Sequence, residues 1–110
     1  MYITLFQLLL GQVASYAQQF NYIQYTKEQG LAGNIAYSIT QDHQGFVWIG
    51  TENGVSRYDG HSFTNFTTDD GLTDNEVLQV LCDSKGRVWF HCFSAPLCFF
   101  EKGKIYNPTN

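Results

Sequence analysis

An internal repeat is the sequence feature that most constrains the fold of this chain. The segment that begins at Gly30 returns at Gly71, 41 residues later, and seven of 22 aligned positions are identical. The identical pairs are Gly30 and Gly71, Leu31 and Leu72, Asn34 and Asn75, Asp42 and Asp83, Gly45 and Gly86, Val47 and Val88, and Trp48 and Trp89. A period of this length is typical of supersecondary units that stack to bury their apolar faces. We therefore expect an array of similar units.

Each unit is predicted to form four short strands joined by tight turns. The expected strands are 35–41, 46–51, 55–58 and 62–67, then 77–82, 87–92, 97–100 and 104–106. Asn53-Gly54 predicts a type I′ hairpin that pairs Glu52 with Val55, and no helix is expected after residue 17. The run Val47-Trp48-Ile49 is apolar at successive positions, so both faces of its strand must be buried. The prediction is an all-β fold of four-stranded antiparallel β-propeller blades.

Composition and the amino-terminal segment narrow the class of protein. The net charge is −4 and no basic cluster exists, which argues against binding to nucleic acid or anionic lipid. Residues 1–17 carry no charge and end in Ser15-Tyr16-Ala17, which predicts an export signal cut before Gln18. The alternative is a buried strand or helix of the mature domain. An exported chain meets oxidising conditions, and we expect Cys92 and Cys98 to be neighbours across a hairpin.

Candidate functional residues are few. His43, His61 and His91 fall in separate turns and strand ends, so no metal site is predicted, and no catalytic or cofactor-binding residue is assigned. Asp42 and Asp83 are interpreted as turn residues, and Trp48 and Trp89 as packing between blades in preference to stacking on sugars. The loop residues most expected to face a ligand are Glu52, Asn53, Arg57, Tyr58, Asp69, Asp70 and Asp74.

The motif of the first unit resembles the two-component regulator propeller repeat. The pattern is Gly-Leu-x-x-Asn, then Asp-x-x-Gly-x-x-Trp-Ile-Gly-Thr, then Asn-Gly-Val-x-Arg-Tyr-Asp-Gly and Phe. It matches at Gly30, Leu31, Asn34, Asp42, Gly45, Trp48, Ile49, Gly50, Thr51, Asn53, Gly54, Val55, Arg57, Tyr58, Asp59, Gly60 and Phe63. The second unit departs after Trp89, where His91 and Cys92 replace Gly50 and Thr51. The resemblance covers about residues 20–110.

That resemblance implies a large exported sensor of the Bacteroidetes type. In such proteins, two seven-bladed propellers precede a β-sandwich, a membrane helix and a histidine kinase, and the propellers sense polysaccharide fragments. This chain would supply about two blades of an incomplete ring, in the periplasmic part of an inner-membrane protein that is dimeric at full length. It carries no kinase motif, so no enzyme activity is expected within it. The alternatives are an exported propeller enzyme or carbohydrate-binding protein without a kinase, or a nonfunctional remnant.

The expected organisation has four parts. They are a signal peptide at 1–17, an orphan strand at 18–29 that closes the last blade, repeat 1 at 30–70 and a truncated repeat 2 at 71–110. The expected partners are the remaining blades and an oligosaccharide ligand, with no cofactor. Because fewer than about three repeats rarely bury a stable core, we expect the chain alone to aggregate, oligomerise or stay partly unfolded.

Overall fold

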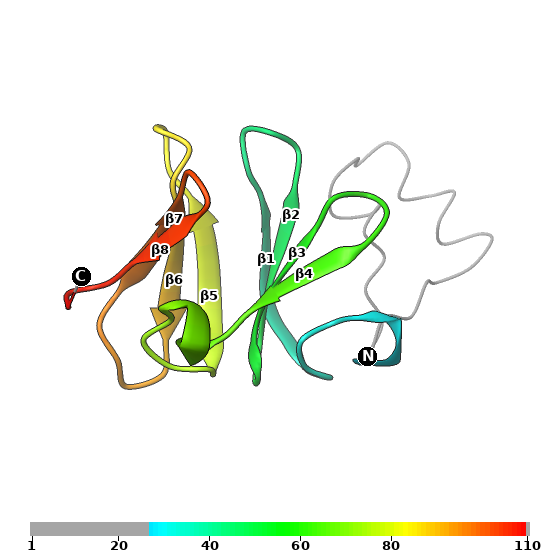
Figure 1. The fold of residues 1–110 in the computed structure, drawn as a ribbon, viewed down its shortest axis with the longest axis horizontal. Coiled ribbons are helices and arrows are strands. Elements are labelled where there is room, and N and C mark those ends of the chain that lie inside the picture. The colour runs from blue at the N-terminus through cyan, green and yellow to red at the C-terminus, as the bar shows by residue number, and fades with distance from the viewer. Residues whose placement is uncertain (1–26, 110) are drawn as a thin grey trace.

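Two four-stranded antiparallel sheets stand side by side in the computed structural model, which describes residues 27–109 (Figure 1). The first sheet contains β1 (Ala36–Gln41), β2 (Val47–Thr51), β3 (Gly54–Tyr58) and β4 (Phe63–Phe66) in that order. The second contains β5 (Val77–Cys82), β6 (Val88–Cys92), β7 (Cys98–Glu101) and β8 (Lys104–Tyr106). The all-β architecture predicted from the sequence is confirmed. The predicted export signal and orphan strand lie outside the described residues, apart from residues 27–29.

The sheets meet through their first strands. Strand β5 packs against β1 and β2, and the Val80 amide donates a hydrogen bond to the Ser38 hydroxyl across the junction at 3.1 Å. Further along the junction, the Gly54 amide donates to the Asn75 carbonyl at 2.5 Å. These polar contacts fix the height of one sheet against the other, because a shift along the strands would leave their donors without acceptors.

The structure contains two short 3₁₀ helices, so the prediction that no helix follows residue 17 is wrong. They are η2 (Lys27–Gln29) and η3 (Thr68–Asp70), and they occupy equivalent places before the two sheets. Thr67 caps η3: its side chain accepts from the Asp69 amide, and the Asp70 carboxylate accepts from the Thr67 amide. Gly71 ends the helix at φ 114°, a left-handed conformation that favours glycine.

The β2–β3 hairpin also differs from the prediction. Thr51 is opposite Gly54, and Gly50 is opposite Val55, so the expected pairing of Glu52 with Val55 is wrong. The Thr51 hydroxyl explains the difference, because it accepts from the Asn53 amide at 3.1 Å and donates to the Gly54 carbonyl at 2.8 Å. The turn is therefore Glu52-Asn53, and of the pair Asn53-Gly54 only Gly54 adopts a positive φ, at 116°.

Two groups of buried side chains form the core. The larger fills the space between the sheets and contains Trp48, Val55, Leu72, Val77, Val80, Val88, Phe90, Cys92, Cys98 and Ile105. The smaller lies on the other face of the first sheet and contains Leu31, Val47 and Ile49. Every residue of β2 is buried, as the apolar run predicts for a strand with neighbours on both faces.

Candidate functional site

An aspartate at the same place in each repeat accepts the same set of hydrogen bonds. One oxygen of Asp42 accepts hydrogen bonds from the Gln44 and Phe46 amides, and the other accepts the Trp48 indole N–H at 2.8 Å. Asp42 thus closes the β1–β2 turn and fixes the indole. A paired-carboxylate catalytic function does not follow, because its oxygens are already engaged.

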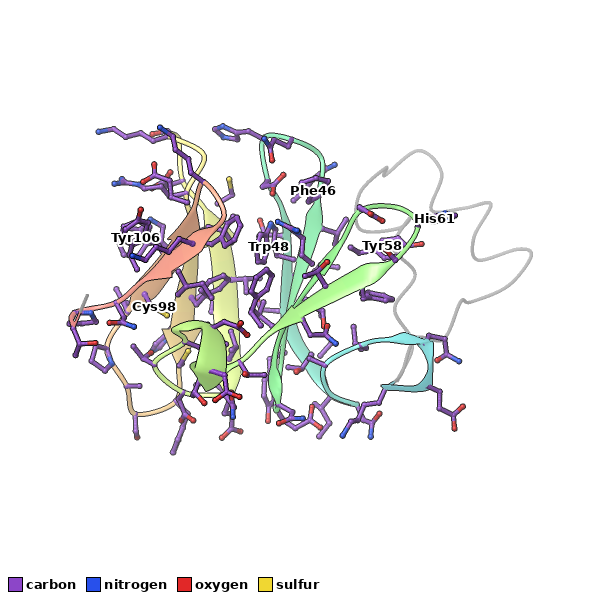
Figure 2. The ribbon with its side chains drawn as sticks, in the orientation of Figure 1. Phe46, Trp48, Tyr58, His61, Cys98 and Tyr106 are labelled. Atoms are coloured by element: carbon purple, nitrogen blue, oxygen red, sulfur yellow. The ribbon has the colours of Figure 1, made fainter. Side chains whose placement is uncertain are left out.

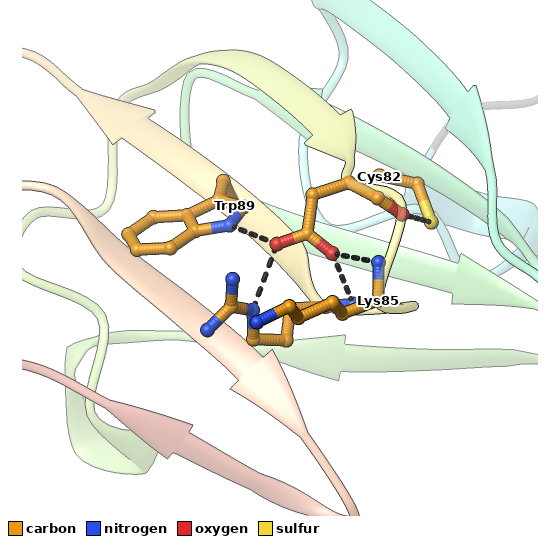
Figure 3. Close-up of polar contacts among 5 residues, drawn as sticks. Cys82, Lys85 and Trp89 are labelled. Carbon is orange, nitrogen blue, oxygen red and sulfur yellow. Dashed lines mark hydrogen bonds and ion pairs between the residues drawn. The ribbon is translucent and has the colours of Figure 1, made fainter.

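Asp83 repeats this arrangement in the second sheet (Figure 3). Its carboxylate accepts from the Lys85 and Arg87 amides and from the Trp89 indole N–H at 2.8 Å. The Arg87 guanidinium adds an ion pair through Nε at 2.7 Å. The pKa of the Asp83 carboxyl lies well below its usual range. The hydrogen bond from Trp89 is the main cause and Arg87 adds to it, whereas burial acts in the opposite direction.

The two tryptophans differ in what covers them. Trp48 is completely buried between the sheets, with ring centroids 4.7 Å from Phe100 and 5.6 Å from both Phe66 and Phe90 (Figure 2). The predicted packing of Trp48 between blades is confirmed. Trp89 is only partly buried: Phe99 lies 4.7 Å from it between ring centroids, Arg87 lies over its ring at 5.6 Å, and no further sheet covers it within the described residues.

The Gly-Leu-x-x-Asn segment that opens each repeat has a structural function. Leu31 and Leu72 are buried, and the side-chain oxygens of Asn34 and Asn75 accept from the Lys27 and Thr68 amides, at the starts of η2 and η3. Gly30 and Gly71 adopt φ near 110°, and their carbonyls accept from the side-chain amides of Asn65 and Asn107. Gly45 and Gly86 take positive φ in the β1–β2 and β5–β6 turns.

Several of the residues expected to face a ligand instead hold loops together. The Glu52 carboxylate accepts from the Asn34 and Ile35 amides at 3.1 and 3.0 Å, and the Asn53 side chain donates to the Ala32 carbonyl. Burial raises the pKa of Glu52, but the two backbone hydrogen bonds outweigh it and lower the pKa overall. The sequence could not indicate this, because the partners lie more than 15 residues away.

The remaining predicted rim residues lie apart from one another. Tyr58 packs on Phe63 with centroids 4.6 Å apart. Asp70 caps η3, Asp69 is exposed beside it, and Asp74 accepts a hydrogen bond from the Asn75 amide. These side chains do not converge on one site.

Arg57 is the predicted rim residue that lies at a cavity. The cavity has a volume of about 380 Å³ and lies between the sheets, where the β1–β2, β5–β6 and β7–β8 turns approach one another. Arg57 lines it together with His43, Lys85, Phe100 and Lys102. Its guanidinium carbon lies 5.0 Å from the Phe46 ring centroid and 5.5 Å from that of Phe100. Residues from both repeats therefore build this candidate site.

The two buried cysteines occupy the places of polar residues in the first repeat. Ser56 accepts from the Ala32 amide, and the corresponding contact in the second repeat joins Thr73 and the Cys98 sulfur at 3.8 Å. Hydrogen bonding between the thiols lowers the pKa of Cys92 and raises that of Cys98. The expected proximity is confirmed, although the ladder places Cys98 opposite Phe90.

Neither a metal centre nor a membrane span emerges from the described part of the chain. Across residues 27–109, no three His, Cys, Asp or Glu side chains gather closely enough to hold a metal ion. Over the same residues, no helix has the length and apolar character needed to cross a bilayer.

Comparisons with known proteins agree with this architecture. The model of the two component regulator propeller family matches residues 30–53 and 71–94. A histidine kinase P4 of Formosa agariphila is 31% identical over 61 residues, which are 56% of this chain and 4% of that protein. A solved extracellular domain, described as that of a hybrid two component system from B. thetaiotaomicron, aligns with a TM-score of 0.64 and 26% identity. The alignment covers 80% of this chain and 13% of that one.

Proposed function

Because this chain carries two repeats of the two-component regulator propeller family, we propose that it forms part of the ligand-sensing propeller of a two-component sensor. The supporting observation is that the repeat match and the fold match agree. The residues that match the repeat model include the first two strands of each sheet. The two stacked four-stranded sheets resemble an extracellular domain of a two component system. The chain spans only a small part of both relatives, so sensing and signalling are properties of the whole protein.

The proposed signal is a polysaccharide fragment bound outside the cytoplasmic membrane. The rigid stacked sheets present their turns as a fixed surface, which suits recognition by loops on a stable scaffold. The signal would pass to a histidine kinase elsewhere in the protein, with further blades and a second copy of the protein as partners. Export of residues 18–110 after cleavage of the first 17 is part of the same proposal.

The test is ligand-dependent autophosphorylation of the whole protein in membrane vesicles. A panel of polysaccharide digests is applied to the extracellular side, and phosphate incorporation is measured. We expect one class of fragment to change the rate, and removal of the propeller to abolish that response while basal phosphorylation remains. A protein that contains no kinase, yet binds or cleaves the fragments, would contradict the proposal and favour an exported carbohydrate-binding protein or enzyme.

A further inference from the structure

The cavity between the two sheets has the dimensions of a small-ligand site. Its volume of about 380 Å³ falls within the range of ~300–1,000 Å³ usual for ligand pockets. The two sheets both contribute to its walls, with Phe100 as an apolar surface and the turns as polar ones. A ligand here would contact both repeats at once.

The charged group nearest its aromatic wall is the guanidinium of Arg57. Its position over the rings of Phe46 and Phe100 holds the planar group in place. Within residues 27–109, the Arg57 guanidinium makes neither a hydrogen bond nor an ion pair. Arg87 provides the contrast, because it stacks over Trp89 at 5.6 Å in the same manner yet donates to Asp83. Arg57 therefore retains the donors that Arg87 uses.

With Arg57 counted, three cationic side chains and two carboxylates line the cavity, so the net charge of its lining favours an anion. Lys85 and Lys102 lie on its rim, and the carboxylates that line it are Asp42 and Glu101. The oxygens of Asp42 are engaged by two amides and the Trp48 indole, so they do not compete for Arg57. Guanidinium groups bind carboxylates through two parallel hydrogen bonds, which are stronger than bonds between neutral groups.

We propose that this cavity binds a carboxylate-bearing sugar, with Arg57 holding the carboxylate, Lys85 and Lys102 adding attraction at the rim, and Phe100 contacting the apolar face of the ring. The sugar part of this inference rests on the proposed function. The carboxylate part rests on the spare donors of Arg57 and on the charges at the cavity.

Isothermal titration calorimetry of the whole protein tests the inference with three probes. D-glucuronate is the acidic sugar, D-glucose is its neutral counterpart, and sodium acetate is a carboxylate without a sugar. We expect glucuronate to bind at least 10-fold more tightly than either. Arg57→Gln is expected to weaken glucuronate binding by about 10-fold to 100-fold, since charge-assisted hydrogen bonds are lost. Arg87→Gln is the matched control and should leave affinity within about threefold.

A thermal melt of each variant shows whether it is folded, and Lys104→Gln replaces Arg87→Gln if the latter unfolds. Equal affinity for glucuronate and glucose, or an unchanged affinity in folded Arg57→Gln, would overturn the inference. Acetate binding as tight as glucuronate would show an anion site that does not recognise sugar. If neutral fragments stimulate phosphorylation while glucuronate fails to bind, the inference fails and the proposed function stands. If glucuronate binds without any kinase response, the proposed function fails.

Discussion

Replacement of Trp48 by alanine should be among the most destabilising single changes in the chain. A buried tryptophan side chain removes ~150–250 Å² from water, which at ~25 cal/mol/Å² corresponds to about 4–6 kcal/mol. Measured truncations of buried Trp cost ~3–5 kcal/mol. Trp48 is fully buried against three rings, so we expect Trp48→Ala to lower the free energy of unfolding by about 3–5 kcal/mol.

A phenylalanine substitution separates packing from hydrogen bonding. Trp48→Phe keeps one aromatic ring but removes the indole donor to Asp42 and part of the buried ring surface; the lost hydrogen bond accounts for about 1–2 kcal/mol of its cost. Trp89→Phe removes the equivalent 2.8 Å bond to Asp83, and it should cost less than Trp48→Phe because Trp89 is only partly buried. The Trp89→Ala variant then reports on the outer face of the second sheet. A cost close to that of Trp48→Ala would show that a further blade covers this face in the whole protein.

Urea unfolding of the whole protein, followed by tryptophan fluorescence and circular dichroism, provides the measurement. Because the fluorescence of each variant changes with the residue replaced, the dichroism midpoint is used for the comparison. A loss of less than about 1 kcal/mol in Trp48→Ala, or equal losses in Trp48→Ala and Trp48→Phe, would refute the packing argument. Trp48 would then be accessible, and stacking on a sugar would again be a reasonable function for it.

Three further predictions concern the sheet junction, acid stability and the thiols. Gly50→Ala should destabilise the protein by about 1–3 kcal/mol, because an added Cβ would lie 2.6 Å from a backbone oxygen of the second sheet. The control in the same urea experiment is His91→Ala, because His91 holds the equivalent position in the second repeat and is exposed. The pKa of Asp83 is lower in the folded protein than the unfolded value of about 3.9, so its ionised carboxylate stabilises the fold above that pH. This stabilisation is lost as the pH falls toward the folded pKa. Thermal melts below pH 4 should therefore show a shallower pH dependence for Asp83→Asn than for the unchanged protein. Cys92 and Cys98 should form a disulfide when a protein disulfide oxidant accepts their two electrons and two protons. The intact mass after alkylation measures how many thiols remain. Two alkylated thiols at these positions after oxidation would contradict the prediction.

The strands and turns could be predicted because the repeat supplies its own internal check. A strand or turn assigned in one repeat had to fit the sequence of the second repeat as well. All eight predicted strands are present, and the ends of each lie within two residues of the predicted bounds. The hairpin register could not be obtained this way. The Asn-Gly rule considers backbone preference alone, whereas the side chain of Thr51 closes the turn one residue earlier. A hydroxyl at this position was visible in the sequence, but its hydrogen bonds were not.

The contacts of the loop residues could not be predicted for a different reason. Position in a turn predicts exposure, and Asn53 is exposed, but the side chains of Glu52 and Asn53 also form hydrogen bonds with a loop far away in the sequence. Arg57 was expected to face a ligand or donate a structural hydrogen bond, and its observed setting depends on Phe100 in the other repeat. Contacts between units decide the function of each loop residue, and periodicity within a unit does not describe them.

The departure of the second repeat from the family pattern has a consequence for what can pack on its outer face. In the first repeat, Gly50 lets the Val77 carbonyl oxygen come within 2.6 Å of where a Cβ would lie, so the second sheet approaches closely at this height. His91 holds the equivalent position in the second repeat and is exposed. A third sheet that approached Trp89 as the second approaches Trp48 would place a backbone oxygen against the His91 Cβ, because the two repeats share their fold. A further blade must therefore stand away from this position or carry a different backbone there, and the junction after the second repeat cannot be a copy of the first.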